Sequence, residues 1–262
     1  GKLALVTGAT SGIGMATARA FVREGARVVA TGRNESALQT LKSEIGCGIV
    51  PGDLTASGAC EKICSESVSA LGGLTTVVNC AGVLQGGAFG AETTNLSNYE
   101  HNFNGNTKSV FEMMTHSIPY LKAAGADAGP SIINVSSVNA MQSFGGVATY
   151  CASKAAVDMF CKCAAVDLAP FGIRCNNVNP GVVVTELQKR GGQTDEQYEA
   201  FLTRSIEVTH PLGEALGRVA DPGEVADLIV FMASDKVILA LMHTYRKILT
   251  TSIFLVYTRL LS

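Results

Sequence analysis

Residues 3–14 read Leu-Ala-Leu-Val-Thr-Gly-Ala-Thr-Ser-Gly-Ile-Gly, a short apolar run that passes directly into a glycine-rich turn. An Ala-rich helical pattern, Ile13–Glu24, follows and ends before Gly25. In such a strand–turn–helix unit, the glycines permit a tight turn, a close approach of the backbone to a phosphate, and close packing of helix on strand. Here the glycines stand four and two residues apart rather than the usual two and three. An ordinary glycine-rich turn is therefore the alternative interpretation.

The alternation of strand and helix continues along the chain. Apolar, β-branched runs with little polar alternation are typical of strands buried on both faces, and they occur at Leu3–Thr7, Arg27–Thr31, Thr76–Asn79, Ser131–Ser136 and Ile173–Asn179. Helical patterns lie between and after them, at Ile13–Glu24, Glu35–Glu44, Cys60–Ala70, Leu96–Leu121, Tyr150–Leu168 and Pro222–Ala233. This order predicts an α/β fold with a doubly wound parallel sheet and helices on both faces.

Two segments break the rhythm. Residues 182–220 form a long, irregular and fairly apolar insert after the predicted strand Ile173–Asn179, which favours a lid over a substrate site. Residues 236–262 form an atypical C-terminal tail without a single Gly. We therefore expect one catalytic domain over residues 1–235. Within the tail, Val237–Met242 or Ile248–Tyr257 is apolar enough to supply a last strand.

Composition excludes several classes of protein. Among the 262 residues, 47% are hydrophobic and only 16% are charged, with a formal net charge of −2, so the chain is neither disordered nor a basic nucleic-acid binder. No unbroken apolar stretch is long enough for a membrane-spanning helix. The chain opens at Gly1 inside an apolar run, without Met or a signal segment, so we expect a trimmed N-terminus and an intracellular protein. The cytoplasm is the expected location, with an organelle as the alternative because of the trimmed N-terminus. We expect its eight cysteines to be reduced thiols and expect no metal site.

A possible acid/base pair lies at the start of the helical pattern Tyr150–Leu168. Tyr150 and Lys154 are four residues apart and so share one helix face. A nearby cation stabilises a phenolate and lowers the pKa of the tyrosine, which would make Tyr150 an acid/base usable near neutral pH. The alternative interpretation is an ordinary surface pair on a helix.

Taken together, these motifs resemble the short-chain dehydrogenase/reductase family, in particular its carbonyl and 3-oxoacyl-[acyl-carrier-protein] reductase-like members. The resemblance covers residues 1 to about 235. It depends on the glycine-rich turn, Asn79-Cys-Ala-Gly82, Ser136-Ser137, Tyr150-x-x-x-Lys154 and Asn179-Pro-Gly181, each at the end of a predicted strand or the start of a helix. It implies a single Rossmann-type domain that uses a nicotinamide dinucleotide.

The resemblance also assigns residues by position. For catalysis it implies Ser137 as a hydrogen-bond donor to the substrate oxygen, Tyr150 as the acid/base, Lys154 as the cation that lowers the Tyr150 pKa, and Asn104 as the helix residue of a proton relay. For cofactor binding it implies Gly8, Ser11, Gly12, Ile13 and Gly14 in the turn, Asp53 and Leu54 at the adenine, Asn79, Ala81 and Gly82 at the adenosine ribose, Tyr150 and Lys154 at the nicotinamide ribose, and Pro180, Gly181, Val183 and Thr185 at the carboxamide. Cys80 departs from the family pattern, which has a second Asn there.

The end of the predicted strand Arg27–Thr31 favours NADP(H) over NAD(H). An NAD enzyme would place Asp or Glu there for the ribose 2′-hydroxyl, whereas this chain has Gly32 followed by Arg33. A guanidinium suits a 2′-phosphate in both charge and geometry. A solvated loop arginine is the alternative interpretation.

The predicted function is hydride transfer between NADP(H) and a small-molecule carbonyl or secondary alcohol. A non-catalytic dinucleotide-binding sensor, a sugar-nucleotide epimerase and a reductase impaired by its tail are the alternatives. The resemblance implies a homodimer or homotetramer, if the tail permits it, and we expect no nucleic-acid or membrane partner.

Overall fold

A computed structural model describes residues 1–210, 212–237 and 244–247, the last group as backbone only. All strands belong to one parallel sheet of order β3-β2-β1-β4-β5-β6-β7. The strands are β1 (Leu3–Thr7), β2 (Arg27–Gly32), β3 (Gly48–Pro51), β4 (Thr76–Asn79), β5 (Ser131–Val135), β6 (Arg174–Pro180) and β7 (Thr244–Lys247). The order reverses between β1 and β4, and such a switch point is where open α/β sheets bind ligands.

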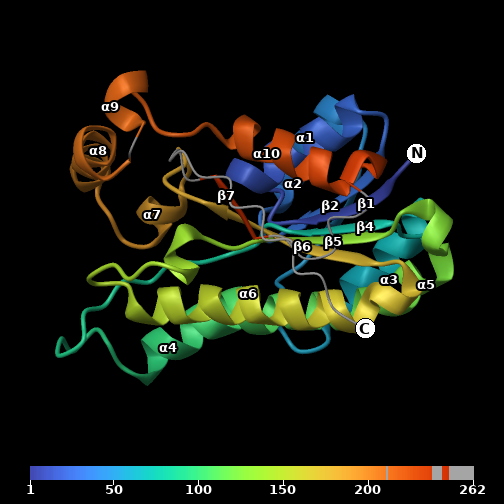
Figure 1. Ribbon diagram of the computed structural model, residues 1–262, viewed down its shortest axis with the longest axis horizontal. Coiled ribbons are helices and arrows are strands. Elements are labelled where there is room, and N and C mark those ends of the chain that lie inside the picture. The colour runs from blue at the N-terminus through green and yellow to red at the C-terminus, as the bar shows by residue number, and fades with distance from the viewer. Residues whose placement is uncertain (211, 238–243, 248–262) are drawn as a thin grey trace, which may run out of the picture.

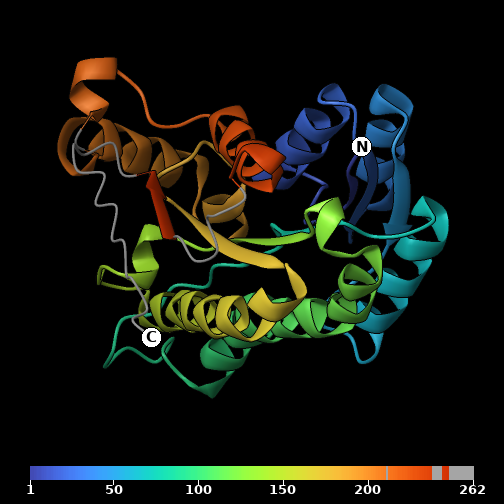
Figure 2. The same cartoon turned by 45° about the vertical axis from the view of Figure 1, so that its right-hand side comes forward.

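Helices cover both faces of the sheet, as predicted (Figures 1 and 2). On one face lie α1 (Gly12–Arg23), α2 (Glu35–Ile45) and α10 (Pro222–Ala233). On the other lie α3 (Ala59–Leu71), α4 (Leu96–Asn102), α5 (Ser109–Ala124) and α6 (Ala148–Leu168). A π-helical segment, Phe103–Lys108, joins α4 to α5, so the predicted helix Leu96–Leu121 is one long helix with a bulge.

The strands form two cores because both of their faces are buried. Leu5 of β1 packs among α3, α5 and α6, whereas its neighbours Ala4 and Val6 pack among α1, α2 and α10. Alternate residues of a strand point to opposite faces, so an almost entirely apolar strand fills both layers. The α10 helix begins at the residue expected from its sequence, with Asp221 and Glu224 forming a capping box and Pro222 in the first turn.

The structure corrects three predictions about elements. The strand β3 was missed, and residues 182–220 are not irregular, because they contain α7 (Leu187–Arg190), α8 (Asp195–Arg204) and α9 (Gly213–Leu216). The strand beside β6 is Thr244–Lys247, between the two predicted stretches of the tail. Apart from Val237, which ends a 3-10 turn, those two stretches lie outside the described residues.

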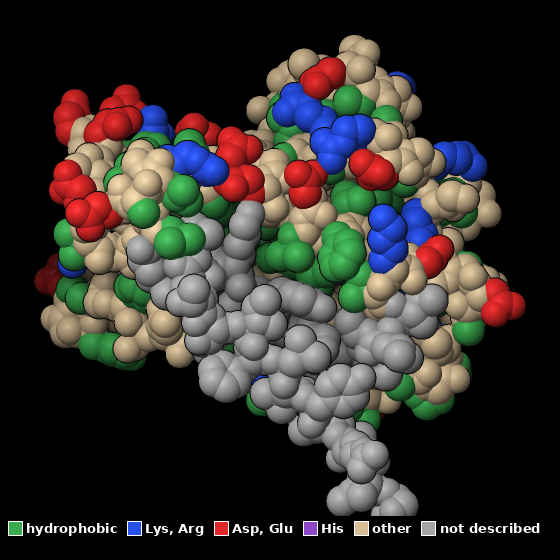
Figure 3. All heavy atoms as spheres, turned by 45° about the horizontal axis from the view of Figure 1, so that its top comes forward, with side chains coloured by type: hydrophobic (Ala, Val, Ile, Leu, Met, Phe, Trp, Pro, Cys, Tyr) green, Lys and Arg blue, Asp and Glu red, His purple; other side chains and the backbone are tan. Residues whose placement is uncertain are grey.

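Two further findings concern the hydropathy of the helices and the charge on one face. No helix in the described part of the chain is long and apolar enough to cross a membrane. On the face seen in Figure 3, acidic and basic side chains are interspersed rather than gathered into a patch of one sign.

Candidate active site

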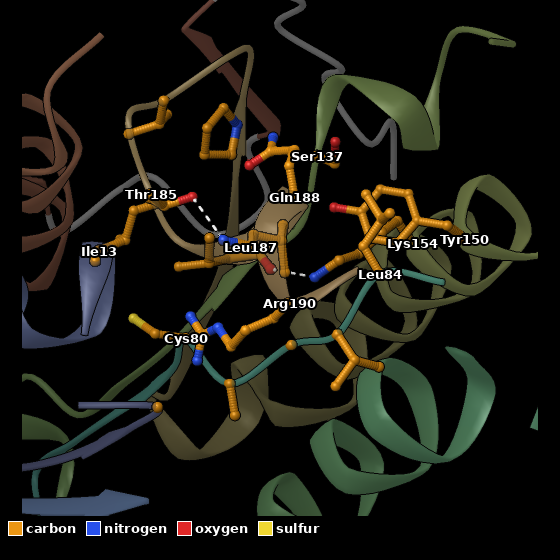
Figure 4. A pocket seen from close by; sticks show the side chains of 18 of the residues that line it. Ile13, Cys80, Leu84, Ser137, Tyr150, Lys154, Thr185, Leu187, Gln188 and Arg190 are labelled. Atoms are coloured by element: carbon orange, nitrogen blue, oxygen red, sulfur yellow. Dashed lines mark hydrogen bonds between the residues drawn. The ribbon is translucent and has the colours of Figure 1, made fainter. Parts of the chain in front are cut away.

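A cavity of about 700 Å³ lies at the carboxyl ends of the strands. Its walls come from the loops that follow β1 to β6 and from residues 182–209 (Figure 4). The volume is typical of a site that encloses a small molecule or a cofactor. Most of the predicted cofactor residues line it: Gly8, Ser11, Gly12, Ile13, Gly14, Arg33, Asp53, Leu54, Ala81, Gly82, Tyr150, Lys154, Pro180, Gly181, Val183 and Thr185.

The glycine-rich turn has the backbone geometry that its glycines permit. Gly8 has a φ of 65° and Gly12 a φ of 51°, both in the left-handed region. A Cβ on Gly14 would lie 2.3 Å from the Gly8 carbonyl oxygen, so only glycine lets α1 pack this closely on the end of β1. Ser11 is the N-cap residue of α1, yet its side chain makes no capping hydrogen bond, and the first turn holds no acidic residue. The positive end of α1 therefore faces the cavity ready for an anion, which fits the pyrophosphate of a dinucleotide.

At the end of β2, a larger residue in the position of Gly32 would require the Thr10 side chain to shift. A Cβ there would lie 2.6 Å from Cγ2 of Thr10. The next residue, Arg33, is exposed and lines the cavity. Asp53 lies across from it, and its pKa is lowered chiefly by the backbone N–H of Thr55 and, to a smaller extent, by the Arg33 guanidinium. One edge of the cavity therefore carries a basic side chain where NAD enzymes carry an acidic one.

Asn79 is the one predicted cofactor residue that does not line the cavity. Its side chain is buried and its Nδ2 donates to Oδ1 of Asn134 at 2.8 Å, across the pairing of β4 with β5. Asn79 therefore links β4 to β5 through its side chain. The residue after it, Cys80, lines the cavity instead.

Ser137, Tyr150 and Lys154 converge on the cavity from the end of β5 and the first turns of α6 (Figure 4). All three are buried, with Tyr150 and Lys154 each 5% exposed. The Lys154 Nζ donates to the carbonyl of Val135 at 2.9 Å and lies 5.9 Å from the centre of the Tyr150 ring. These positions place a phenol, a hydroxyl and an ammonium around one point of the cavity wall.

Burial dominates the electrostatics of Tyr150 and Lys154. Burial raises the pKa of Tyr150 to about 12, while the Ser137 hydroxyl acts in the opposite direction, and Lys154 makes no resolved contribution. The lowering of the Tyr150 pKa by Lys154 therefore stays a prediction. Burial also lowers the pKa of Lys154 to about 8, against the opposing charge of Asp158. The Tyr150 phenol therefore keeps its proton at neutral pH, and the neighbouring Lys154 has a pKa only slightly above neutral.

Asn104, the predicted residue of the proton relay, does not line the main cavity. It lies in the π-helical segment but is exposed, and it lines a separate surface hollow with Phe103 and Phe111. Asn106, two residues further on, is fully buried. Its Oδ1 accepts from the Val83 N–H at 2.8 Å, and its Nδ2 donates to the Val83 carbonyl and the Ser153 hydroxyl, both at 3.0 Å.

The position of Asn106 ties it to the catalytic group. A Cβ on Gly82 would lie 3.2 Å from Asn106 Oδ1 and 3.4 Å from Lys154 Nζ, so both side chains meet the same glycine of the cavity wall. The spacing of Asn98, Asn102 and Asn106 is a signal that could have identified it, because residues four apart share a helix face. The first two of these amides also bind the loop after β4, through the Gln85 carbonyl.

A hydrogen-bonded chain of buried polar side chains, which the sequence analysis did not identify, ends at the backbone of Ser137. Asn134 donates to Asn177 at 3.1 Å, and Asn177 donates to Asp158 at 3.0 Å. Asn179 donates to the other carboxylate oxygen of Asp158 at 2.9 Å and to the backbone carbonyl of Ser137 at 2.9 Å. Asp158 stands one turn after Lys154 on α6, and burial raises its pKa despite these donors. The chain therefore connects the centre of the sheet to Ser137 and Lys154.

The segment after β6 closes the cavity from the side of α1. Val183 pairs with Ala220 in an isolated parallel bridge, which joins the two ends of the 182–220 insert. The Thr185 side chain lies 3.1 Å from where a Gly12 Cβ would stand. Leu187, Gln188, Gln193 and Phe201 of the insert also line the cavity. The insert thus forms one wall and meets the loop after β4, where a Cβ on Gly191 would lie 2.7 Å from the Leu84 carbonyl oxygen.

Comparisons with known proteins agree with this geometry. The sequence profile described as short chain dehydrogenase matches residues 2–196. The L-fucose dehydrogenase of Rattus norvegicus is 32% identical over 237 residues, which cover 90% of this chain and 84% of that protein. The NADP-dependent (R)-specific alcohol dehydrogenase of Lentilactobacillus kefiri is 33% identical over 242 residues and 90% of each chain. The structure of a short-chain dehydrogenase/reductase of Caenorhabditis elegans with cofactor superposes with a TM-score of 0.82 and 29% identity, over 92% of this chain and 91% of that one.

Proposed function

This chain belongs to the short-chain dehydrogenase/reductase family, and we propose that it reduces a carbonyl compound with NADPH, reversibly, with Tyr150 as general acid/base. Members of the family are NAD(P)-dependent oxidoreductases that act on CH–OH and carbonyl groups. The observation that carries the proposal is the convergence of Ser137, Tyr150 and Lys154 on a cavity whose opposite end is a glycine-rich turn at an uncapped helix.

The residues of the cavity divide into parts that suit the parts of a dinucleotide. The backbone of Gly12, Ile13 and Gly14 would bind the pyrophosphate at the N-terminus of α1, and Asp53 and Leu54 would flank the adenine. Ala81 and Gly82 would contact the adenosine ribose. Tyr150 and Lys154 would hold the nicotinamide ribose, and Pro180, Gly181, Val183 and Thr185 would hold the carboxamide. When bound, the nicotinamide supplies the hydride that the protein itself lacks.

Preference for NADP(H) is supported by the end of β2. Gly32 stands where an NAD enzyme would carry an acidic residue, and Arg33 offers a guanidinium to a 2′-phosphate. The L. kefiri relative is an NADP-dependent enzyme, in keeping with this preference.

In the reductive direction, the protein's part is to place and protonate the substrate oxygen. Tyr150 donates its phenolic proton to that oxygen, and its raised pKa keeps the proton in place until then. Ser137 donates a hydrogen bond to the same oxygen. Lys154 places a positive charge near the Tyr150 ring as long as its ammonium stays protonated. Asn106, rather than Asn104, holds the helix bulge beside Lys154, where a proton relay to solvent would start.

We further propose that residues 182–220 act as a lid over the substrate, and we call this segment the lid. Its apolar and amide side chains, including Leu187, Gln188 and Phe201, would enclose the substrate against Ser137 and Tyr150. Apolar walls suit acyl, steroid-like or aromatic carbonyl compounds. The predicted homo-oligomer, the cytoplasmic location and the impairing effect of residues 236–262 stay predictions.

The test is consumption of NADPH and NADH in the presence of a panel of ketones, diketones and 3-oxoacyl thioesters. The proposal predicts carbonyl-dependent oxidation of NADPH with a lower kcat/KM for NADH. Binding of NADPH without turnover of any panel member, in the range of pH 6 to 8, would instead favour the dinucleotide-binding sensor.

A further inference from the structure

We propose that Arg190 of the lid is a cofactor-binding residue, which holds the pyrophosphate of the dinucleotide against the N-terminus of α1. The inference rests on the proposed function, since it concerns how the lid meets the cofactor of the same site. None of the assignments carried over from the family includes this residue. It makes the lid a part of the cofactor site as well as of the substrate site.

The position of Arg190 is fixed by two hydrogen bonds. Its Nη2 donates to the Oγ of Ser11 at 2.9 Å, across 179 positions of sequence. Its Nε donates to the backbone carbonyl of Glu186, one turn earlier, at 3.3 Å. Both Arg190 and Ser11 line the cavity, and Figure 4 shows the Arg190 side chain extending into it. The guanidinium therefore lies beside the turn that would hold the pyrophosphate.

The charges around this contact call for an anion. The uncapped N-terminus of α1 is a positive end, and Arg190 adds a full positive charge beside it. Among residues 1–210 and 212–237, no acidic side chain forms an ion pair with Arg190. A pyrophosphate would satisfy both groups, because a guanidinium binds phosphate oxygens with two parallel donors. Since the Ser11 Oγ accepts from Arg190, its own hydroxyl proton stays available to a phosphate oxygen.

The neighbouring cations have other roles, which makes the inference specific. Lys189 pairs with Asp195 at 2.6 Å and faces the Tyr198 ring, and it does not line the cavity. Arg33 lies at the end of β2, where it would meet the 2′-phosphate that only NADP(H) carries. The pyrophosphate is common to both cofactors, so loss of Arg190 weakens both, whereas loss of Arg33 weakens only one.

The experiment measures equilibrium binding of NADPH and of NADH, by the change in nicotinamide fluorescence, to the full chain and three variants. Arg190→Ala is expected to raise the Kd for both cofactors by a similar factor of about 10 or more, the usual effect of losing a charge-assisted hydrogen bond. Arg190→Lys keeps the charge and recovers part of the affinity. Lys189→Ala, which removes the same charge from the adjacent position, leaves both Kd values close to those of the unaltered chain.

A second readout follows the lid itself. Hydrogen exchange of residues 187–204 is expected to slow when NADPH is added to the unaltered chain. In Arg190→Ala, it is expected to slow much less at saturating NADPH. Unchanged Kd values in Arg190→Ala, or equal losses in Arg190→Ala and Lys189→Ala, would overturn the inference alone. Failure of the unaltered chain to bind either nucleotide would overturn the proposed function and the inference with it.

Discussion

Replacing Asn106 by Ala should destabilise the protein far more than replacing its neighbour Asn104. Asn106 is fully buried and makes three hydrogen bonds with its side chain, two of them to the backbone of Val83. Ala would leave the Val83 N–H and carbonyl and the Ser153 hydroxyl without these partners. A buried polar group left unsatisfied costs about 1–3 kcal/mol, and partial relaxation brings the total to about 2–5 kcal/mol.

The matched control is Asn104→Ala, in the same π-helical segment. Asn104 is exposed, so its loss should change the free energy of unfolding by no more than about 0.5 kcal/mol. For a domain of this size, the Asn106 variant should unfold about 5–15 °C lower in Tm, measured by circular dichroism. Because Asn106 meets Gly82 together with Lys154, kcat should fall in this variant at a temperature where it remains folded. Equal changes in Tm and kcat for the two variants would refute the assignment of the buried position to Asn106.

Three further predictions concern the same cavity. Arg33→Ala should raise the Kd for NADPH about 10-fold or more and leave that for NADH nearly unchanged, by fluorescence titration, and an equal loss for both would contradict the NADP(H) preference. Reductive kcat/KM should fall as pH rises through about 8, because Lys154 then loses its proton while Tyr150, with a pKa of about 12, keeps its own. A value of kcat/KM that stays level to pH 10 would show that the charge of Lys154 is not needed. Asp158→Ala should lower the Tm and kcat together, because the amides of Asn177 and Asn179 lose their acceptor, whereas a fully stable and active variant would show that this buried chain does not position Ser137.

Much of the fold follows from the sequence because its parallel strands are buried on both faces. The runs at β1, β2, β4, β5 and β6 are apolar enough to stand out, and each was predicted to within one residue at either end. The strand β3, Gly48–Pro51, was missed because it is four residues long and carries Gly and Pro at its ends. Pairing with β2, rather than any local preference, makes it a strand.

The sequence indicates which strand ends meet at the site. It does not indicate which side chains near the site are buried. The carboxyl ends of neighbouring strands lie at one edge of the sheet, and the glycine turn, Ser137 and Tyr150 line one cavity there. The π-bulge and the choice between Asn104 and Asn106 depend on which helix face is buried. Asp158 was missed because its partners come from β6, and a sequence gives no sign that two strand asparagines will face one helix carboxylate.

The pKa of Tyr150 also depends on burial, which the sequence does not reveal. The spacing of Tyr150 and Lys154 predicts that the two side chains converge, and they do. It does not reveal that Lys154 turns its ammonium to the Val135 carbonyl and that burial dominates the tyrosine pKa. Desolvation depends on the whole enclosure of the cavity, which no local motif encodes.

The central claim is that Tyr150 protonates the substrate oxygen, and Tyr150→Phe tests it most directly. The change keeps the buried ring and removes only the hydroxyl, so the Kd for NADPH should rise by no more than about 10-fold, the cost of one hydrogen bond to the nicotinamide ribose. The single-turnover rate of NADPH oxidation with the best carbonyl substrate of the panel should fall by about 10²- to 10⁴-fold, the usual contribution of general acid catalysis. A variant that binds NADPH normally and retains most of the single-turnover rate would contradict the account.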